Sequence, residues 1–246
     1  MKSLIITSKD NPRVKHIIKL LESRDCRYEH KQYVLEGIRA LDGLKTVEEL
    51  FVREGASAPS IVTKALYTLS PKVFDVVAKT EHSQGVMAVC AMPPEISKID
   101  LNKRYILLDR LQDPGNMGAI MRTACAFGFD GVLITKGSVD PFSPKAVRSA
   151  MGAEHITPIK QLQNLDELAP CNIIAADMHG TSLPSFNWPS GFVLCIGSEA
   201  HGISQEIETM SQCSVAIPIQ KNMESLNASV SAGILAYAAS SFCHEI

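Results

Sequence analysis

Residues 104–135 read RYILLDRLQDPGNMGAIMRTACAFGFDGVLIT, and this stretch decides the fold class. Two apolar runs, Tyr105–Leu108 and Gly131–Ile134, have the length of buried strands and flank a helical pattern near 117–128. A strand, a helix and a second strand in this order form a unit whose two strands lie parallel in one sheet. The stretch therefore predicts an α/β protein with a parallel sheet.

The same alternation continues to the end of the chain. Further strands are expected at Ile173–Ala176, Phe192–Ile196 and Val215–Ile219, with helices near 144–152, 203–210 and 225–241. This pattern predicts a mostly parallel sheet that helices cover on both faces. Ligands of open α/β sheets bind beyond the carboxyl ends of the strands, so a site is expected in the loops that follow the strands.

A smaller α/β unit is expected before this sheet. Pro93 and Pro94 interrupt the apolar pattern, and a linker near 92–102 divides the chain into domains 1–92 and 103–246. In the first domain, Asn11 is placed to cap a helix near 11–24. After it we expect a strand at Tyr33–Leu35, a helix near 37–45, and further short elements that end in Val86–Cys90.

Composition excludes several classes of protein. The 246 residues include 24 Lys and Arg and 26 Asp and Glu, and 46% of the residues are hydrophobic, which is typical of a globular chain and not of a disordered one. No window holds the roughly 20 apolar residues that span a bilayer. The apolar run before Lys9 is too short for a signal peptide. We therefore expect a cytoplasmic protein with no membrane partner.

Several site patterns are missing. The seven cysteines are an odd number without a C-x-x-C pair, and the seven histidines show no ligand-like spacing, so neither disulfides nor a metal site is expected. The glycine patterns of dinucleotide and P-loop sites are absent. The serine-hydrolase elbow and the zinc-protease motif are absent too.

Positive charge gathers at the start of the chain. Residues 1–31 contain eight basic and four acidic residues. The apolar stripe of the helix near 11–24 leaves Arg13, Lys15 and Lys19 toward solvent. Such an excess attracts phosphate groups, although a solvated helix face has the same composition. The residues alone leave both interpretations open.

Two of the expected loops have residues that could bind a ligand, one through an anion and the other through close approach of the protein backbone. Asn116 and Arg122 follow the first strand of the second domain, where helix amides and a guanidinium can face an anion. Gly197 and Glu199 follow Phe192–Ile196, where glycine allows close backbone approach. Each has an ordinary alternative, namely a surface ion pair for Arg122 and a glycine-rich connection with Glu199 near the next helix.

A third loop precedes the last helix. Ser225 and Asn227 are both placed to cap that helix, which is a structural role. The order of the three loops along the chain is more specific than any one of them.

Taken in order, N-x-G-x-x-x-R-T-A (residues 116–124), G-S-E-x-x-G (residues 197–202) and I-P-I…E-S-L-N (residues 217–227) resemble the three motifs of the SpoU (TrmH) family. Its members are S-adenosylmethionine-dependent RNA ribose 2′-O-methyltransferases of the SPOUT superfamily. The beginning of the chain, with NPRVK at 11–15 and YVLEG at 33–37, is similar to the small L30e-like substrate-binding domain that many members carry.

This resemblance implies a C-terminal α/β-knot domain, in which a deep trefoil knot holds the S-adenosylmethionine. It also implies a homodimer formed through this domain and a reaction without a metal. RNA phosphates would then be contacted by Arg13, Lys15 and Lys19. The implied cofactor contacts are Gly197, Ile217, Ile219 and Leu226, and the implied catalytic residues are Asn116, Arg122, Glu199, Ser225 and Asn227.

The chain departs from the family pattern at two positions. Lys221 stands where a glycine is usual in the cofactor loop, and Ala228 stands where a valine is usual. The implied catalytic set is complete. Because a guanidinium with a pKa above about 12 is a poor base, we expect Arg122 to hold the neighbouring phosphate and stabilise the developing alkoxide.

The additional N-terminal domain favours ribosomal RNA as the substrate over transfer RNA. Two other classes remain open at this point. One is a non-catalytic RNA-binding or RNA-maturation factor on the same scaffold, and the other is a small-molecule α/β enzyme, in which the basic N-terminal region would have no role.

Overall fold

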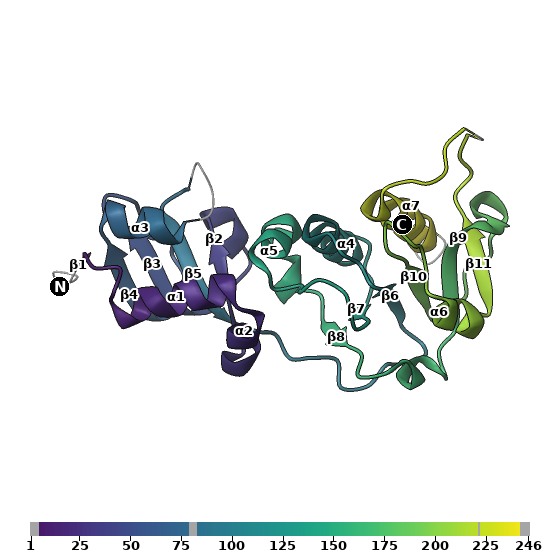
Figure 1. Ribbon diagram of the computed structural model, residues 1–246, viewed down its shortest axis with the longest axis horizontal. Coiled ribbons are helices and arrows are strands. Elements are labelled where there is room, and N and C mark those ends of the chain that lie inside the picture. Colours follow the sequence, from purple (N-terminus) through teal and green to yellow (C-terminus); the bar gives the residue numbers. More distant parts are fainter. Residues whose placement is uncertain (1–4, 79–82, 221, 242–246) are drawn as a thin grey trace.

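The computed structural model describes residues 5–78, 83–220 and 222–241, and it contains two sheets, one in each half of the chain (Figure 1). The prediction of an α/β protein with a smaller N-terminal unit is confirmed. Residues 92–103, between the two sheets, form neither helix nor strand. In the described part of the chain, we find no helix with the length and hydropathy needed to cross a bilayer.

The N-terminal sheet is mixed, with strand order β1-β4-β3-β5-β2. Strands β1, β4 and β3 run parallel, and β5 runs antiparallel to its neighbours β3 and β2. The strands are β1 (Ile5–Ile6), β2 (Gln32–Glu36), β3 (Thr46–Arg53), β4 (Val62–Leu69) and β5 (Val86–Ala91), and the helices are α1 (Pro12–Glu22), α2 (Arg24–His30) and α3 (Pro71–Val77).

Two predictions for this half were only partly right. The helix near 11–24 is two helices, because Ser23 ends α1 and its Oγ then accepts the N–H of Cys26 in the first turn of α2, at 3.2 Å. The helix near 37–45 is only a 3-10 turn at Ile38–Leu41. Gly37 and Gly43 have φ of 97° and 85°, and this left-handed backbone on both sides prevents a longer helix.

The C-terminal sheet is entirely parallel, with strand order β11-β9-β10-β6-β7-β8. The strands are β6 (Arg104–Leu108), β7 (Gly131–Ile134), β8 (Ile159–Gln161), β9 (Ile173–Ser182), β10 (Phe192–Ile196) and β11 (Cys213–Ala216), and the helices are α4 (Pro114–Ala126), α5 (Pro144–Ala150), α6 (Gln205–Met210) and α7 (Ala228–Ser241); short 3-10 turns occur at Ala153–His155, Leu165–Leu168 and Leu183–Ser185.

Every strand and helix expected in this half is present: Gly131–Ile134 and Phe192–Ile196 match β7 and β10 at both ends, and the other elements have shifted ends. Strand β8 was not predicted, and β9 extends six residues past the predicted end at Ala176. Strand β11 stops at Ala216 instead of Ile219, because Pro218 has no N–H to continue the ladder. The segment after Ala216 is thereby free to line the site described below.

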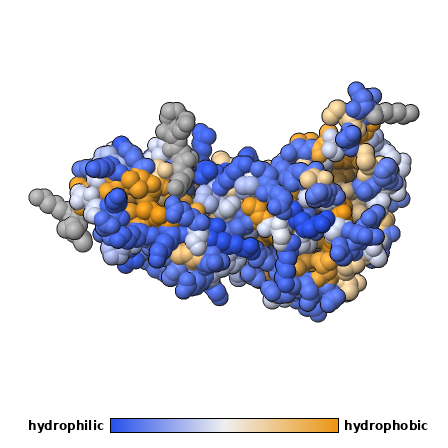
Figure 2. Space-filling view, in the orientation of Figure 1, coloured by the Kyte–Doolittle hydropathy of each residue, from blue (hydrophilic) through white to orange (hydrophobic). Residues whose placement is uncertain are grey.

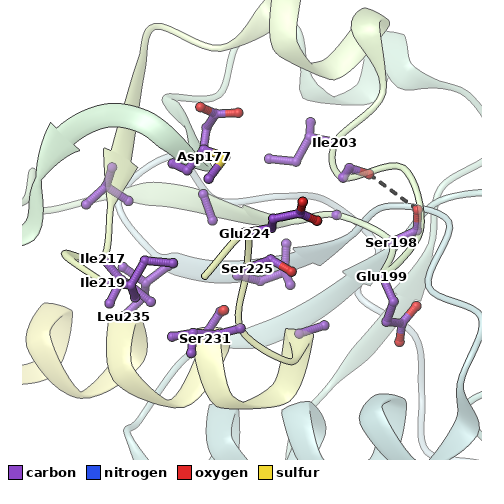
Figure 3. A pocket seen from close by; sticks show the side chains of 18 residues that line it. Asp177, Ser198, Glu199, Ile203, Ile217, Ile219, Glu224, Ser225, Ser231 and Leu235 are labelled. Atoms are coloured by element: carbon purple, nitrogen blue, oxygen red, sulfur yellow. Dashed lines mark hydrogen bonds between the residues drawn. The ribbon is translucent and has the colours of Figure 1, made fainter. Parts of the chain in front are cut away.

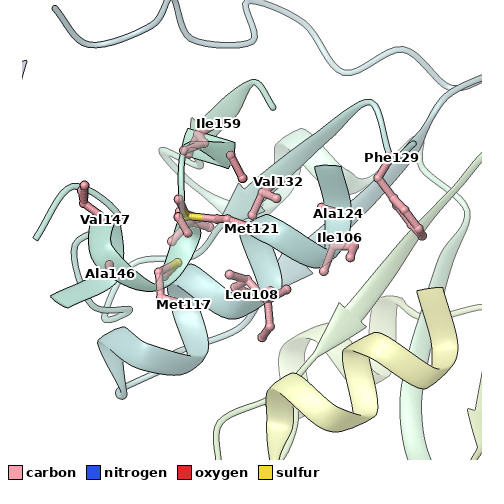
Figure 4. Close-up of a cluster of buried hydrophobic side chains, with 14 of the residues drawn as sticks. Ile106, Leu108, Met117, Met121, Ala124, Phe129, Val132, Ala146, Val147 and Ile159 are labelled. Carbon is pink, nitrogen blue, oxygen red and sulfur yellow. The ribbon is translucent and has the colours of Figure 1, made fainter. Parts of the chain in front are cut away.

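One core cluster of the C-terminal half lies between the sheet and helices α4, α5 and α7 (Figure 4), and a second cluster includes Leu107 of β6 and Ile207 of α6. Ile106 and Leu108 of β6 pack with Met117 and Met121 of α4, and all four are fully buried. Gly118 lets α4 and α5 approach closely, because a Cβ at this position would lie 2.1 Å from the carbonyl oxygen of Ala146. The glycine of the first motif therefore serves helix packing.

Figure 2 shows that hydrophilic residues cover most of the visible face, with hydrophobic residues gathered over the N-terminal sheet and on the C-terminal half. The two halves also contact each other directly. The Tyr33 hydroxyl lies 3.1 Å from Nδ1 of His155, and the Tyr33 ring packs against Phe142 with ring centroids 5.1 Å apart.

Candidate cofactor pocket and catalytic site

The strand order places a site at the middle of the C-terminal sheet. The chain runs from β6 through β7 to β8 on one side, and β10, β9 and β11 lie on the other. The boundary between β6 and β10 is therefore the point at which the strand order reverses, where ligands of open α/β sheets bind. A cavity of about 240 Å³ lies next to this boundary, at the carboxyl ends of β9, β10 and β11, and helix α7 forms one of its sides.

All four predicted cofactor residues line this cavity, namely Gly197, Ile217, Ile219 and Leu226. Figure 3 shows Ile217 and Ile219 side by side at one side of it. Position 197 has room only for a glycine, because a Cβ there would lie 2.2 Å from the carbonyl carbon of Gly202. Ser198 and Gly202 exchange two backbone hydrogen bonds, at 3.0 and 2.9 Å, which close the loop tightly.

Sequence reasoning missed part of the lining. Asp177 and Met178 follow the point at which β9 stops pairing with β10, and Glu224 precedes the predicted Ser225. Figure 3 shows the Asp177 and Glu224 carboxylates at the cavity. Their negative charge favours a cationic group in the ligand. The position of Asp177, just after the predicted strand Ile173–Ala176, is the signal that could have identified it.

The three motifs meet through side-chain hydrogen bonds. Nδ2 of Asn116 donates to Oε1 of Glu199 at 2.6 Å, and Nδ2 of Asn227 donates to Oδ1 of Asn116 at 3.1 Å. The structure therefore brings together three residues that lie up to 111 positions apart in the sequence. Ser225, the fourth member of the predicted catalytic set, is exposed at the cavity.

Asn227 also has the structural role expected from the sequence. Its Oδ1 accepts the backbone N–H groups of Ser229, at 2.9 Å, and Val230, at 3.3 Å, in the first turn of α7. Both nitrogen and oxygen of this amide are thus used, one to reach Asn116 and the other to begin the helix. The two interpretations of Asn227 are compatible.

Two aspartates fix the loops around this set. Asp113 accepts the N–H of Asn116 at 2.9 Å and pairs with Nζ of Lys145 at 2.7 Å, and the Lys145 ammonium holds the pKa of the Asp113 carboxyl below its usual value. Asp109, which sequence reasoning missed, is buried and accepts the N–H of Ser204 at 2.7 Å. It ties the end of β6 to the glycine loop after β10.

Arg122 is not among the residues that line the cavity. Arg122 follows Asn116 by six residues on α4, so the two side chains are about 240° apart around the helix axis and lie on different faces of the helix. Its side chain is exposed, and within residues 5–78, 83–220 and 222–241 we find no ion pair or hydrogen bond for its guanidinium. The surface ion pair considered from the sequence is therefore not seen there. Lys221 lies outside the described residues, and Ala228 begins α7 at the cavity.

The basic residues of α1 differ in their surroundings. Arg13 forms an ion pair with Glu49 and lies over the ring of Tyr67, 5.6 Å from its centroid. Lys15 pairs with Asp10 at 3.0 Å. Lys19 is exposed and has no partner that we observe in the described part of the chain. Of the three predicted RNA contacts, Lys19 is the most available to an outside phosphate.

Comparison with known proteins shows the family to which the chain is similar. Residues 103–237 match the SpoU rRNA Methylase family, and residues 11–88 match the MRM3-like substrate binding domain. The chain is 31% identical to the 23S rRNA (guanosine(2553)-2′-O)-methyltransferase RlmP of Bacillus subtilis, with 94% of this chain and 97% of that protein covered.

Solved structures share the fold of this chain. The AdoMet-bound rRNA methyltransferase from Sinorhizobium meliloti is 26% identical, has a TM-score of 0.80, and matches over 97% of this chain and 98% of its own. The SpoU methyltransferase AviRb from Streptomyces viridochromogenes, at 24% identity and a TM-score of 0.83, shares the fold over 94% of this chain and 97% of its own. The chain belongs to the SpoU rRNA Methylase family.

Proposed function

We propose that this protein transfers a methyl group from S-adenosylmethionine to a ribose 2′-hydroxyl of ribosomal RNA. The observation that carries the proposal is the meeting of Asn116, Glu199 and Asn227 beside a cavity lined by the other motif residues. The near full-length similarity to a 23S rRNA 2′-O-methyltransferase favours ribosomal RNA over transfer RNA.

The cavity suits the cofactor chemically. Ile217, Ile219 and Leu226 offer apolar contacts to an aromatic base, and the Asp177 and Glu224 carboxylates suit the cationic part of the molecule. When bound, S-adenosylmethionine supplies a methyl group on a positively charged sulfur. Gly197 lets the loop after β10 close against Gly202, and this closed loop forms one wall of the cavity.

The polar residues would position the RNA. Glu199 holds the Asn116 amide by a charge-assisted hydrogen bond, and Asn227 holds the same amide from the other side. The ribose oxygen must lie about 3–3.5 Å from the methyl carbon for an in-line displacement, so such fixed groups favour reaction. Although Arg122 lies outside the cavity on the exposed side of α4, we assign it to the RNA phosphate next to the reacting ribose, as the family resemblance implies, where its charge would stabilise the developing alkoxide.

The test is transfer of tritium from labelled S-adenosylmethionine to size-fractionated RNA, with the wild type beside Arg122→Ala. We expect label in the ribosomal fraction at a 2′-O-methylated nucleotide, and about 10²–10³-fold less with the variant at unchanged cofactor affinity. Arg53→Ala, which removes a partly exposed arginine of the N-terminal sheet, is the control.

Each other result contradicts a stated part of the proposal. Label confined to the transfer RNA fraction contradicts the substrate. Cofactor binding without transfer to any RNA, including intact ribosomal subunits, favours a non-catalytic RNA-binding factor. An active Arg122→Ala variant contradicts the role of Arg122.

Three further expectations belong to this proposal. The linker near 92–102 would separate an RNA-binding domain, 1–92, from the catalytic domain, 103–246. The cofactor loops would form the trefoil knot that the family resemblance implies. The protein would act in the cytoplasm.

The proposal also includes a homodimer formed through α7. Val230, Ile234 and Tyr237 recur at helical spacing and are 50%, 37% and 62% exposed, so α7 presents an apolar face outward. Ile234→Glu is expected to convert the dimer to a monomer in light scattering. Ile156→Glu, at another exposed isoleucine, should leave it unchanged. A wild-type monomer would contradict this assignment.

A further inference from the structure

A cluster of metal-binding residues lies outside the methyltransferase site. His16, Cys26 and His30 each offer one ligand atom, and these three atoms all lie within 4.8 Å of one another. The two imidazole rings meet edge to face, with centroids 4.9 Å apart. The proposed reaction uses none of these three side chains.

The junction of α1 and α2 builds this cluster. Cys26 and His30 are four residues apart on α2, so they lie on the same face of that helix. His16 comes from α1, and Ser23 joins the two helices directly by ending one and capping the other. Three ligands that no sequence motif groups together are thus assembled by a sharp turn between two helices.

A second residue orients one of the ligands. Nε2 of His16 lies 2.8 Å from Oε1 of Gln32 at the start of β2. If this nitrogen donates its hydrogen to the amide oxygen, Nδ1 keeps the lone pair that can bind a metal. Histidines that bind metals usually donate their other ring N–H to an oxygen in this manner.

We propose that His16, Cys26 and His30 bind a divalent transition-metal ion of the zinc type, with water in the fourth position. One thiolate and two imidazoles are the donors that select such an ion over Mg²⁺ or Ca²⁺. With bonds of about 2.0–2.3 Å, ligand atoms on a tetrahedral ion lie roughly 3.5 Å apart. The observed spacing therefore needs only small side-chain movements, and binding releases the Cys26 thiol proton to solvent.

Burial and access fit the same assignment. Cys26 is 9% exposed and packs in the core beneath α1 and α2, whereas His30 is exposed and gives an ion a path from solvent. A bound ion would fasten α2 to α1. Because α1 carries Lys19 and α2 carries Arg27, which bonds to Asp140 of the C-terminal half, the ion would stiffen the part of the molecule between the RNA-binding face and the catalytic half.

The experiment is a titration of the chelator-treated full-length protein with Co²⁺, followed by absorption spectroscopy, and then competition with Zn²⁺. We expect one Co²⁺ per chain, a thiolate-to-cobalt charge-transfer band, and loss of that band when Zn²⁺ is added. Zn²⁺ should also raise the melting temperature, since an ion that binds only the folded state stabilises it.

Variants identify the site. Cys26→Ser should abolish the charge-transfer band, and His30→Ala, a change at an exposed residue, should weaken binding at least tenfold. Gln32→Ala should weaken it about 10–100-fold, because it removes the oxygen that orients His16. Cys213→Ser and His179→Ala alter an exposed cysteine and an exposed histidine elsewhere and should bind as the wild type does.

The proposal fails if the wild type shows no charge-transfer band, because Cys26 would then be an ordinary core thiol. It also fails if the band survives Cys26→Ser or if His30→Ala leaves the affinity unchanged. None of these three results depends on methyl transfer, so the metal site and the proposed activity are tested separately.

Discussion

Arg27 of α2 donates hydrogen bonds from Nε and Nη2 to Oδ2 of Asp140, at 2.8 and 2.5 Å, and the two side chains are only 5% and 6% exposed. Nη1 of Arg27 donates to the Leu20 carbonyl oxygen at 2.6 Å. The other oxygen of Asp140 accepts the Tyr28 hydroxyl and the Phe142 N–H. A buried and well-bonded ion pair thus joins the two halves of the protein.

Arg27→Ala is expected to destabilise the protein by about 3–5 kcal/mol, because it leaves the Asp140 carboxylate buried without its cation. Urea unfolding measures the change. The comparison is Arg53→Ala, which breaks an exposed pair with Asp75 and should cost less than about 1 kcal/mol. If the two variants lost the same free energy of unfolding, burial would not determine the strength of the ion pair between Arg27 and Asp140.

Gly197→Ala should destabilise the protein by about 1–3 kcal/mol, since the new methyl group has no room beside Gly202. It should also weaken S-adenosylmethionine binding at least tenfold in calorimetry, because the loop that lines the cavity must move. Gly233→Ala on α7 is the matched change: no heavy atom lies within 4 Å of the added methyl group. That variant should gain about 0.5–1 kcal/mol and keep its cofactor affinity.

Asn227→Asp separates the two roles of Asn227. The carboxylate still accepts the N–H groups that begin α7, so the melting temperature should stay close to the wild-type value. The donor to Asn116 is lost, and the single-turnover rate of methyl transfer should fall about 10²-fold from misplacement of that group. A variant that melts early but reacts normally would reverse this assignment.

The basic face of α1 is tested by the salt dependence of RNA binding. Lys19→Ala should weaken binding and lower the slope of log affinity against log salt by about 0.7–0.9, the value for one lost phosphate contact. Lys15→Ala should have the smaller effect, because Lys15 already pairs with Asp10. Unchanged slopes for both variants would mean that this helix face is only solvated.

By itself, the sequence determined the fold class and the identity of the site loops. Strands such as Phe192–Ile196 are continuous apolar runs, and caps such as Asn11 act on neighbouring residues, so local patterns suffice to place them. The resemblance of the three motifs to the SpoU family then predicted which residues surround the cofactor, and all four predicted cofactor residues line the cavity. The predicted ends of the helices were less accurate, because single hydrogen bonds decide them, such as the one that the Cys26 N–H donates to Ser23 Oγ.

Only the tertiary structure decided which distant residues meet. Asn116 reaches Glu199, Arg27 reaches Asp140, and His16 reaches Cys26 and His30 because the strand order and the helix junction bring separate segments together. No spacing along the chain records these contacts. A local pattern reflects interactions within a few residues, whereas burial and charge pairing depend on how the sheets and helices pack, which exists only once the whole chain has folded.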